Sequence, residues 1–113
     1  MNIRDSSRLH DTLDAAGKIQ RWIAGSNSLA FAHDELLQSG IERQLEIIGE
    51  SLRVVRNRYP EIEEDFPEIH GWIALRNIVA HEYQVVDYDA IWSACTQELP
   101  ILVERLTNIL DVS

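Results

Sequence analysis

Apolar residues recur every three or four positions along most of this chain, which is the spacing of amphipathic α-helices. The first such stripe predicts a helix that begins at an N-cap, Asp5 or Ser6, and runs to Ala24, where Gly25 stops it. Its apolar face comprises Leu9, Leu13, Ala16, Ile19 and Ile23. No alternation of apolar and polar residues is long enough to predict a β-strand.

The second stripe predicts the longest helix, from about Asp34 to Arg58, after a turn at residues 26–28. Its apolar seam comprises Leu37, Ile41, Leu45, Ile48, Leu52, Val55 and Tyr59. Ile47 and Val54 form a second apolar line beside this seam. Two uses of that line stay open, namely a wider intramolecular core and contact with a second copy of the chain.

A third helix is expected after the second one ends at Tyr59-Pro60, because the residue before a proline disfavours helical backbone. An acidic connection, Glu61–Asp65, leads into it. The helix starts near Pro67, since proline suits the first helical turn, and it is expected to fray around His81.

A fourth helix is expected from the cap residue Asp87 to about Ile109, with a kink or a break at Pro100. The sequence therefore predicts the all-α class. The architecture is an up-and-down helical bundle of four main helices, and residues 1–113 are expected to form a single domain.

The composition is that of an ordinary globular protein, with 45% apolar and 26% charged residues. Cys95 is the only cysteine, so no intrachain disulfide can form and a reduced, cytoplasmic location is expected. Neither a metal site nor a cofactor is expected. No apolar run approaches the length of a membrane span, and the first residues lack the apolar run of a signal peptide, so no membrane partner is expected.

The charge balance excludes one way of binding nucleic acid. Ten basic and nineteen acidic side chains give a formal net charge of −9, which argues against coating a polyanion through bulk charge. Arg43, Arg53, Arg56 and Arg58 nevertheless gather toward the end of the second helix. They either form a local positive rim or pair with neighbouring acids, and we expect pairing for about half of them.

The segment from Arg76 to Tyr83 places a guanidinium, an amide, an imidazole and a phenol within eight residues. On a helix, Asn77 and His81 lie four residues apart on one face, so the amide can hydrogen-bond the imidazole and fix its tautomer. Arg76 lies about 140° around the axis from His81. The two can meet on one ligand through the reach of arginine, through a helix end near His81, or through a second copy of the motif.

These side chains suit cleavage of RNA without a metal ion. A histidine with an ordinary pKa of about 6.5 can take or give a proton near neutral pH. An arginine can hold a phosphate with paired hydrogen bonds and stabilise the charge of the transition state. RNA supplies its own nucleophile, the 2′-hydroxyl. The residues alone leave another interpretation open, in which Arg76 pairs with an acid such as Glu82 or Glu50 and His81 caps a helix end.

This segment resembles the R-x4-H-x-Y signature of the HepT-like toxins, a branch of the HEPN superfamily. Further similarities to that family are Trp72, the pair Arg76-Asn77, Ile47–Ser51 on the second helix, Val86–Tyr88 and Ile91-Trp92. Together they extend over most of the chain, from about Leu9 to Leu106. Ser51 stands where members of the family often have alanine.

The resemblance implies a homodimeric endoribonuclease whose two R-x4-H motifs meet in a cleft between the subunits. Arg76 and His81 would be catalytic and Asn77 would orient them. Glu50, if it is buried beside Arg76, would position the guanidinium. The substrate would be RNA, either a tRNA or an mRNA, cut to leave a 2′,3′-cyclic phosphate.

The resemblance also implies a partner, an MntA-like minimal nucleotidyltransferase that acts as the antitoxin of a type VII toxin–antitoxin system. It would transfer AMP to Tyr83, and the added bulk and charge would block the place of an RNA phosphate. Two rival functions stay open: a non-catalytic substrate-binding or regulatory subunit of a nucleotidyltransferase, and a plain helical dimerisation module. The nuclease is favoured because a scaffold would not need all four polar side chains.

Overall fold

A computed structural model describes the backbone of residues 6–80 and 86–111, and the side chains of these residues apart from 77–80. Helices and no strands occur within those ranges, which confirms the all-α prediction. The elements in chain order are α1 (Ser7–Ile23), α2 (Ser28–Ala32), α3 (Glu35–Arg58), α4 (Ile62–Asp65), α5 (Ile69–Ala80), α6 (Tyr88–Ser93), the π-helix η1 (Ala94–Glu98) and α7 (Leu99–Asp111).

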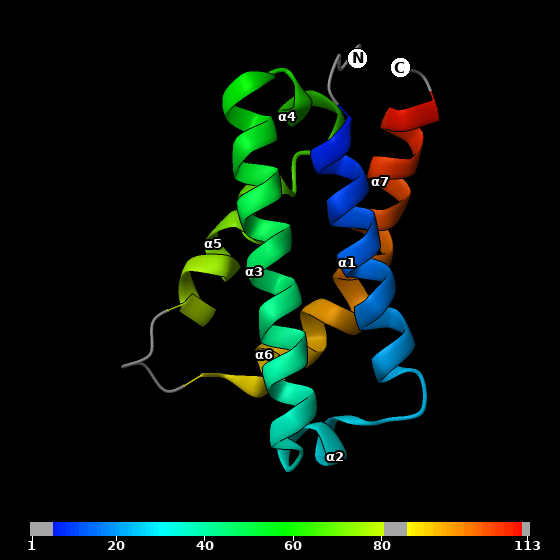
Figure 1. Cartoon of the computed structure of the whole chain (residues 1–113), viewed down its shortest axis with the longest axis vertical. Helices are drawn as coiled ribbons and strands as arrows, with labels where there is room; N and C mark the ends of the chain where they lie inside the picture. The colour runs from blue at the N-terminus through cyan, green and yellow to red at the C-terminus, as the bar shows by residue number, and fades with distance from the viewer. Residues whose placement is uncertain (1–5, 81–85, 112–113) are drawn as a thin grey trace.

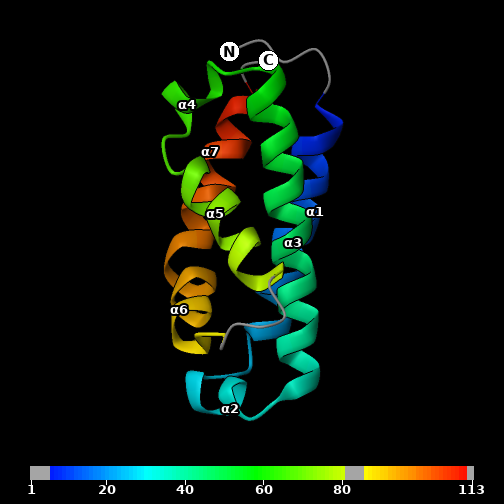
Figure 2. The same ribbon diagram turned by 90° about the vertical axis from the view of Figure 1, so that its left-hand side faces the viewer.

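The bundle has four main rods: α1, α3, α5 and the continuous rod made of α6, η1 and α7. Figure 1 shows α1 and α3 antiparallel and side by side, with α5 on the side of α3 that is away from α1. The view in Figure 2 places α5 between α3 and the α6–α7 rod. Helix α3 makes its most extensive contacts with α1 and with α5, so it is the central element of the fold.

Two helices start at aspartate caps, of which Asp87 was predicted as a cap and Asp34 only as an approximate helix start. The side chain of Asp34 accepts a hydrogen bond from the backbone N–H of Leu37 at 3.0 Å, and that of Asp87 accepts one from Ala90 at 3.1 Å. Such bonds satisfy backbone donors that have no partner inside the helix. Ser6 precedes α1 without a side-chain capping bond.

The core is made of the predicted apolar stripes. Helix α3 contributes five seam residues that are at most 2% exposed, whereas the ends of the seam, Leu37 and Tyr59, are half-buried. Burying each such side chain stabilises a fold by about 1.5–3 kcal/mol before entropy is counted. The buried apolar residues of the main rods include Leu9, Ala16, Ile19, Ile41, Leu45, Ile48, Leu52, Val55, Ile69, Trp72, Ile73, Ile91, Leu99, Leu102, Leu106 and Ile109.

Pro100 distorts the last rod, as predicted, without breaking it. Proline has no N–H to donate, and its ring clashes with the carbonyl four residues earlier. The chain widens here into the π turn η1, in which the N–H of Leu99 donates to the carbonyl of Ala94. Helix α7 then continues along the bundle (Figure 1).

The structure adds two short helices that periodicity did not predict. Helix α2 starts at Ser28, the last residue of the expected turn, and α4 occupies most of the acidic connection. Phe31 of α2 is 1% exposed, and its ring centroid lies 5.7 Å from that of Tyr88 and 5.5 Å from that of Trp92. Contacts with α6 therefore hold α2 in place. None of the described helices has the length and apolar character that crossing a bilayer requires.

Candidate active site

Arg76 is the predicted catalytic residue whose side chain the structure describes. Its Nη2 lies 3.9 Å from Oε2 of Glu50, and the two side chains are 38% and 40% exposed. Glu50 therefore lies beside Arg76, as considered from the sequence, but it is half-exposed rather than buried. The backbone of Asn77 belongs to α5, whereas its side chain, His81 and Tyr83 lie outside the described residues. Their predicted roles are untested by the structure.

A glycine in α3 allows α5 to come close enough to place Arg76. A Cβ atom added to Gly49 would overlap the Cβ of Arg76, and it would lie 2.7 Å from Cγ of Arg76 and 3.2 Å from the carbonyl oxygen of Trp72. Packed atoms do not tolerate such approach, so a larger residue would push the helices apart. Trp72 is 4% exposed and lies one turn before Arg76, which fixes the rotation of α5 about its axis.

Glu50 is shared between two arginines. It accepts hydrogen bonds from Arg53 Nε at 3.1 Å and from Arg53 Nη2 at 2.7 Å, in addition to its contact with Arg76. The hydrogen bonds from Arg53 hold the pKa of Glu50 below its ordinary value, and the charges of Arg53, Arg76 and Arg8 act in the same direction against partial desolvation. The carboxylate is therefore ionised at neutral pH, where it restrains the guanidinium of Arg76.

The arginine group at the end of α3 is partly neutralised. Besides the Arg53–Glu50 pair, Arg43 Nη1 lies 3.5 Å from Oε2 of Glu46. Arg56 instead lies 3.1 Å from Nδ1 of the exposed His70. Arg43 and Arg53 thus pair with acids of their own helix, so that a continuous positive rim does not form from this group alone.

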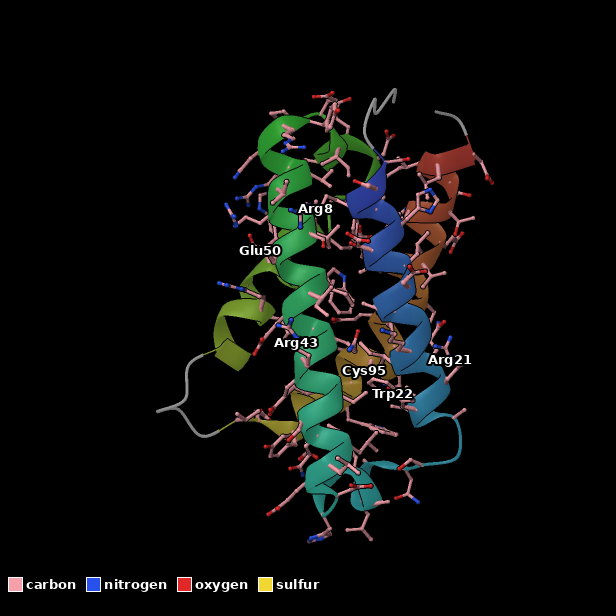
Figure 3. All side chains as sticks on the ribbon, in the orientation of Figure 1. Arg8, Arg21, Trp22, Arg43, Glu50 and Cys95 are labelled. Carbon is pink, nitrogen blue, oxygen red and sulfur yellow. The ribbon has the colours of Figure 1, made fainter. Side chains whose placement is uncertain are left out.

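A polar groove of about 420 Å³ runs between α1 and α3 and reaches Arg76. Figure 3 shows Arg8, Glu50 and Arg43 along this face of the bundle. The residues that line it are Arg8, Asp11, Asp14, Ala15, Lys18, Arg43, Gln44, Glu46, Ile47, Glu50, Ser51 and Arg76.

The α1 side of the groove was not predicted from the sequence. Arg8, Asp11, Ala15 and Lys18 follow spacings of three, four and three, which place them on one helix face. That periodicity was the available signal. The partner helix that this face meets becomes known only from the tertiary structure.

Other reactive groups lie elsewhere. Cys95 is 2% exposed, and burial raises the pKa of its thiol to about 12, so the thiolate that a nucleophile needs is absent at neutral pH. Among the residues that the structure describes, no three or more histidine, cysteine, aspartate or glutamate side chains are grouped as metal ligands.

Comparison with known proteins identifies the family. The model of the family "Ribonuclease HepT-like" matches residues 12–109, and the chain belongs to this family. The chain is 30% identical over 95 residues to "Putative RNase MJ1380" of Methanocaldococcus jannaschii, covering 81% of this chain and 84% of that protein. It is 34% identical over 83 residues to "Putative RNase TTE0752" of Caldanaerobacter subterraneus, covering 72% and 71%. No solved structure matches significantly. The predicted family is thereby confirmed, and membership supports a ribonuclease that acts on RNA.

The close approach at Gly49 gives a direct test of how Arg76 is placed. If Arg76 is catalytic, as predicted, Gly49→Ala should lower RNA cleavage on the order of 100-fold, because the added methyl group displaces the guanidinium. It should also lower the free energy of unfolding by about 1–3 kcal/mol through overpacking. Denaturant unfolding and a cleavage assay measure the two effects.

Gly71→Ala is the matched control, since Gly71 lies in α5 and a Cβ there meets nothing within 4 Å. It should raise the free energy of unfolding by about 0.5–1 kcal/mol and leave cleavage unchanged. Wild-type activity in a folded Gly49→Ala protein would show that cleavage does not depend on this packing.

Proposed function

We propose that this chain is the endoribonuclease toxin of a type VII toxin–antitoxin system and that it cleaves RNA without a metal ion. The observation that carries the proposal is the placement of Arg76. Its stem packs on Gly49, its guanidinium lies beside Glu50, and it reaches the end of a polar groove. A guanidinium in such a position can bind a phosphate through paired, charge-assisted hydrogen bonds.

In the proposed reaction His81 takes the proton of the ribose 2′-hydroxyl, and the 2′-oxygen attacks the adjacent phosphorus. The bond from phosphorus to the 5′-oxygen breaks, and an acid gives a proton to that leaving oxygen. The products are a 2′,3′-cyclic phosphate and a 5′-hydroxyl. Arg76 stabilises the negative charge that builds on the phosphate oxygens, and Asn77 holds the imidazole in one tautomer.

The proposed site is completed by a second copy of the chain. On an ideal helix, positions five residues apart, such as 76 and 81, project about 140° apart, whereas a two-fold arrangement would bring two copies of Arg76 and His81 to one cleft. One histidine can then act as the base and the other as the acid. The surface proposed for this contact is the line of Ile47 and Val54, which are both half-buried on α3, close to Glu50.

Control of the nuclease is proposed to occur at Tyr83. A cognate nucleotidyltransferase would transfer AMP to the phenol, which lies two residues after His81 in the sequence. The new phosphodiester would bind Arg76 in place of the RNA phosphate, and the nucleotide would fill the space that the substrate needs.

One observation favours a second candidate, the non-catalytic subunit of a nucleotidyltransferase. The carboxylate of Glu50 already contacts Arg76, and an arginine that serves packing and pairing alone would make the same contact. The two functions differ in what the loss of Arg76 does. A catalytic arginine is needed for cleavage, whereas a structural one is needed for stability.

The chemistry is tested by Arg76→Ala and His81→Ala, each of which should lower cleavage by about 10²–10³-fold or more while the circular dichroism spectrum stays that of the wild type. Arg105→Ala is the control. Arg105 lies on α7, and its Nη2 lies 2.9 Å from Oε1 of Glu68. Cleavage should continue in EDTA. If chelation stops the reaction and a divalent ion restores it, the mechanism is wrong.

The dimer is tested by light scattering at micromolar concentration, where a mass of twice 13.0 kDa is expected. Ile47→Glu combined with Val54→Glu should yield an inactive monomer, because four like charges at an isologous contact repel. Leu36→Glu changes a residue of the same helix that is 84% exposed and should leave mass and activity unchanged. A monomeric wild type that cleaves RNA would contradict the shared site.

Modification is tested by co-expression with the neighbouring nucleotidyltransferase followed by intact-mass and peptide analysis. AMP-sized additions confined to Tyr83, with loss of cleavage, are expected. Tyr59→Phe removes another hydroxyl as the control and should still be modified and silenced. If Tyr83→Phe is neutralised as fully as the wild type, silencing works through complex formation instead.

A further inference from the structure

The groove between α1 and α3 extends well beyond Arg76. Arg8 and Lys18 are exposed on α1, and within the described part of the chain neither forms an ion pair. Ten residues of helix separate them, which corresponds to about 15 Å. Arg43 lines the groove from α3. A stacked nucleic acid strand carries a phosphate about every 3.4 Å, so this length fits on the order of four nucleotides.

The charge of the groove differs from that of the rest of the chain. Its lining holds four of the ten basic side chains and four of the nineteen acidic ones, so the lining is formally neutral. The remainder of the chain carries the entire net charge of −9. The negative charge of the remaining chain repels a polyanion, and this repulsion is weaker along the neutral groove.

A buried amide in the groove indicates what kind of ligand fits. Gln44 lines the groove and is 7% exposed, and its Oε1 is buried without a hydrogen-bond partner from the described residues. Buried acceptors are nearly always satisfied in folded proteins. An acceptor needs an N–H or O–H donor, which a phosphate diester lacks and which a nucleobase provides through its amino or imino groups.

We propose that the α1–α3 groove binds the single-stranded segment of RNA that leads away from the scissile phosphate. Arg8, Lys18 and Arg43 contact phosphates at different points along the strand, and Gln44 hydrogen-bonds the edge of one unpaired base. The direction of the strand rests on the proposed function, which puts the scissile phosphate at Arg76. Binding of RNA by the groove is a separate property that can be measured without cleavage.

The test measures the binding of fluorescent single-stranded RNAs of about 12 nucleotides to the full chain carrying His81→Ala, as a function of salt. Arg8→Gln, Lys18→Gln and Arg43→Gln should each weaken binding several-fold for all sequences. Each should also lower the slope of log Kd against log salt by about 0.7. Arg21→Gln is the matched control, because Arg21 lies on α1 outside the groove (Figure 3) and should change neither quantity.

The base contact is tested with RNAs that differ by one base at one position. Gln44→Met keeps the size of the side chain but removes the amide, so a preference of about fivefold for one base should disappear while the salt slope stays the same. A preference that Gln44→Met leaves unchanged, or no preference at all, overturns the base contact.

The remaining outcomes separate this proposal from the proposed function. If the wild type cleaves RNA and the groove variants bind as tightly as Arg21→Gln, the groove proposal fails and the nuclease stands. If the groove variants bind RNA normally but change the mass in light scattering, the groove is an interface between copies. If the groove variants weaken RNA binding although the wild type does not cleave, the groove proposal holds and the catalytic function fails.

Discussion

The contact between α3 and α5 at Gly49 is the constraint on which the candidate site depends. Two helices normally pack with side chains between them, but here the stem of Arg76 lies directly on the backbone of its neighbour. This close contact restricts the conformations that the long side chain of Arg76 can adopt. It brings the guanidinium to Glu50, which two hydrogen bonds from Arg53 hold in turn. The absence of a side chain at Gly49 therefore determines where the positive charge of Arg76 lies on the surface of the bundle.

The Arg53–Glu50–Arg76 cluster also has a definite dependence on pH. The pKa of Glu50 is lowered in the folded chain, so its contribution to stability is fully present above the ordinary pKa of a glutamate. That contribution is lost as the pH falls through the lowered value. Because these side chains are about two-fifths exposed, solvent screens the interaction, and its main effect is on the orientation of Arg76 rather than on stability.

Local rules predicted much of the fold, because most of its elements are specified by residues close together in the chain. Asp87 caps its helix where expected, the longest helix begins next to Asp34 as expected, and the distortion before Pro100 follows from proline chemistry. Helix α2 was missed because Phe31 is held by rings more than fifty residues later in the sequence. Contacts between residues far apart in the sequence also explain why two other features were missed. These are the role of Gly49 and the position of Arg8 and Arg43 in one groove. The roles of Asn77, His81 and Tyr83 remain predictions from the motif.

The π turn before Pro100 has a consequence for the length of the chain. A π turn contains one more residue than an α turn, yet Ile91 before it and Leu102 after it are both buried in the same core. The extra residue is therefore absorbed locally instead of rotating the second half of the rod away from the bundle. A chain that lacked one exposed residue of this turn, such as Thr96, would have to close it into an ordinary helical turn, in which the ring of Pro100 again clashes with the carbonyl four residues earlier. The length of the last rod at this point is thus tied to the presence of Pro100.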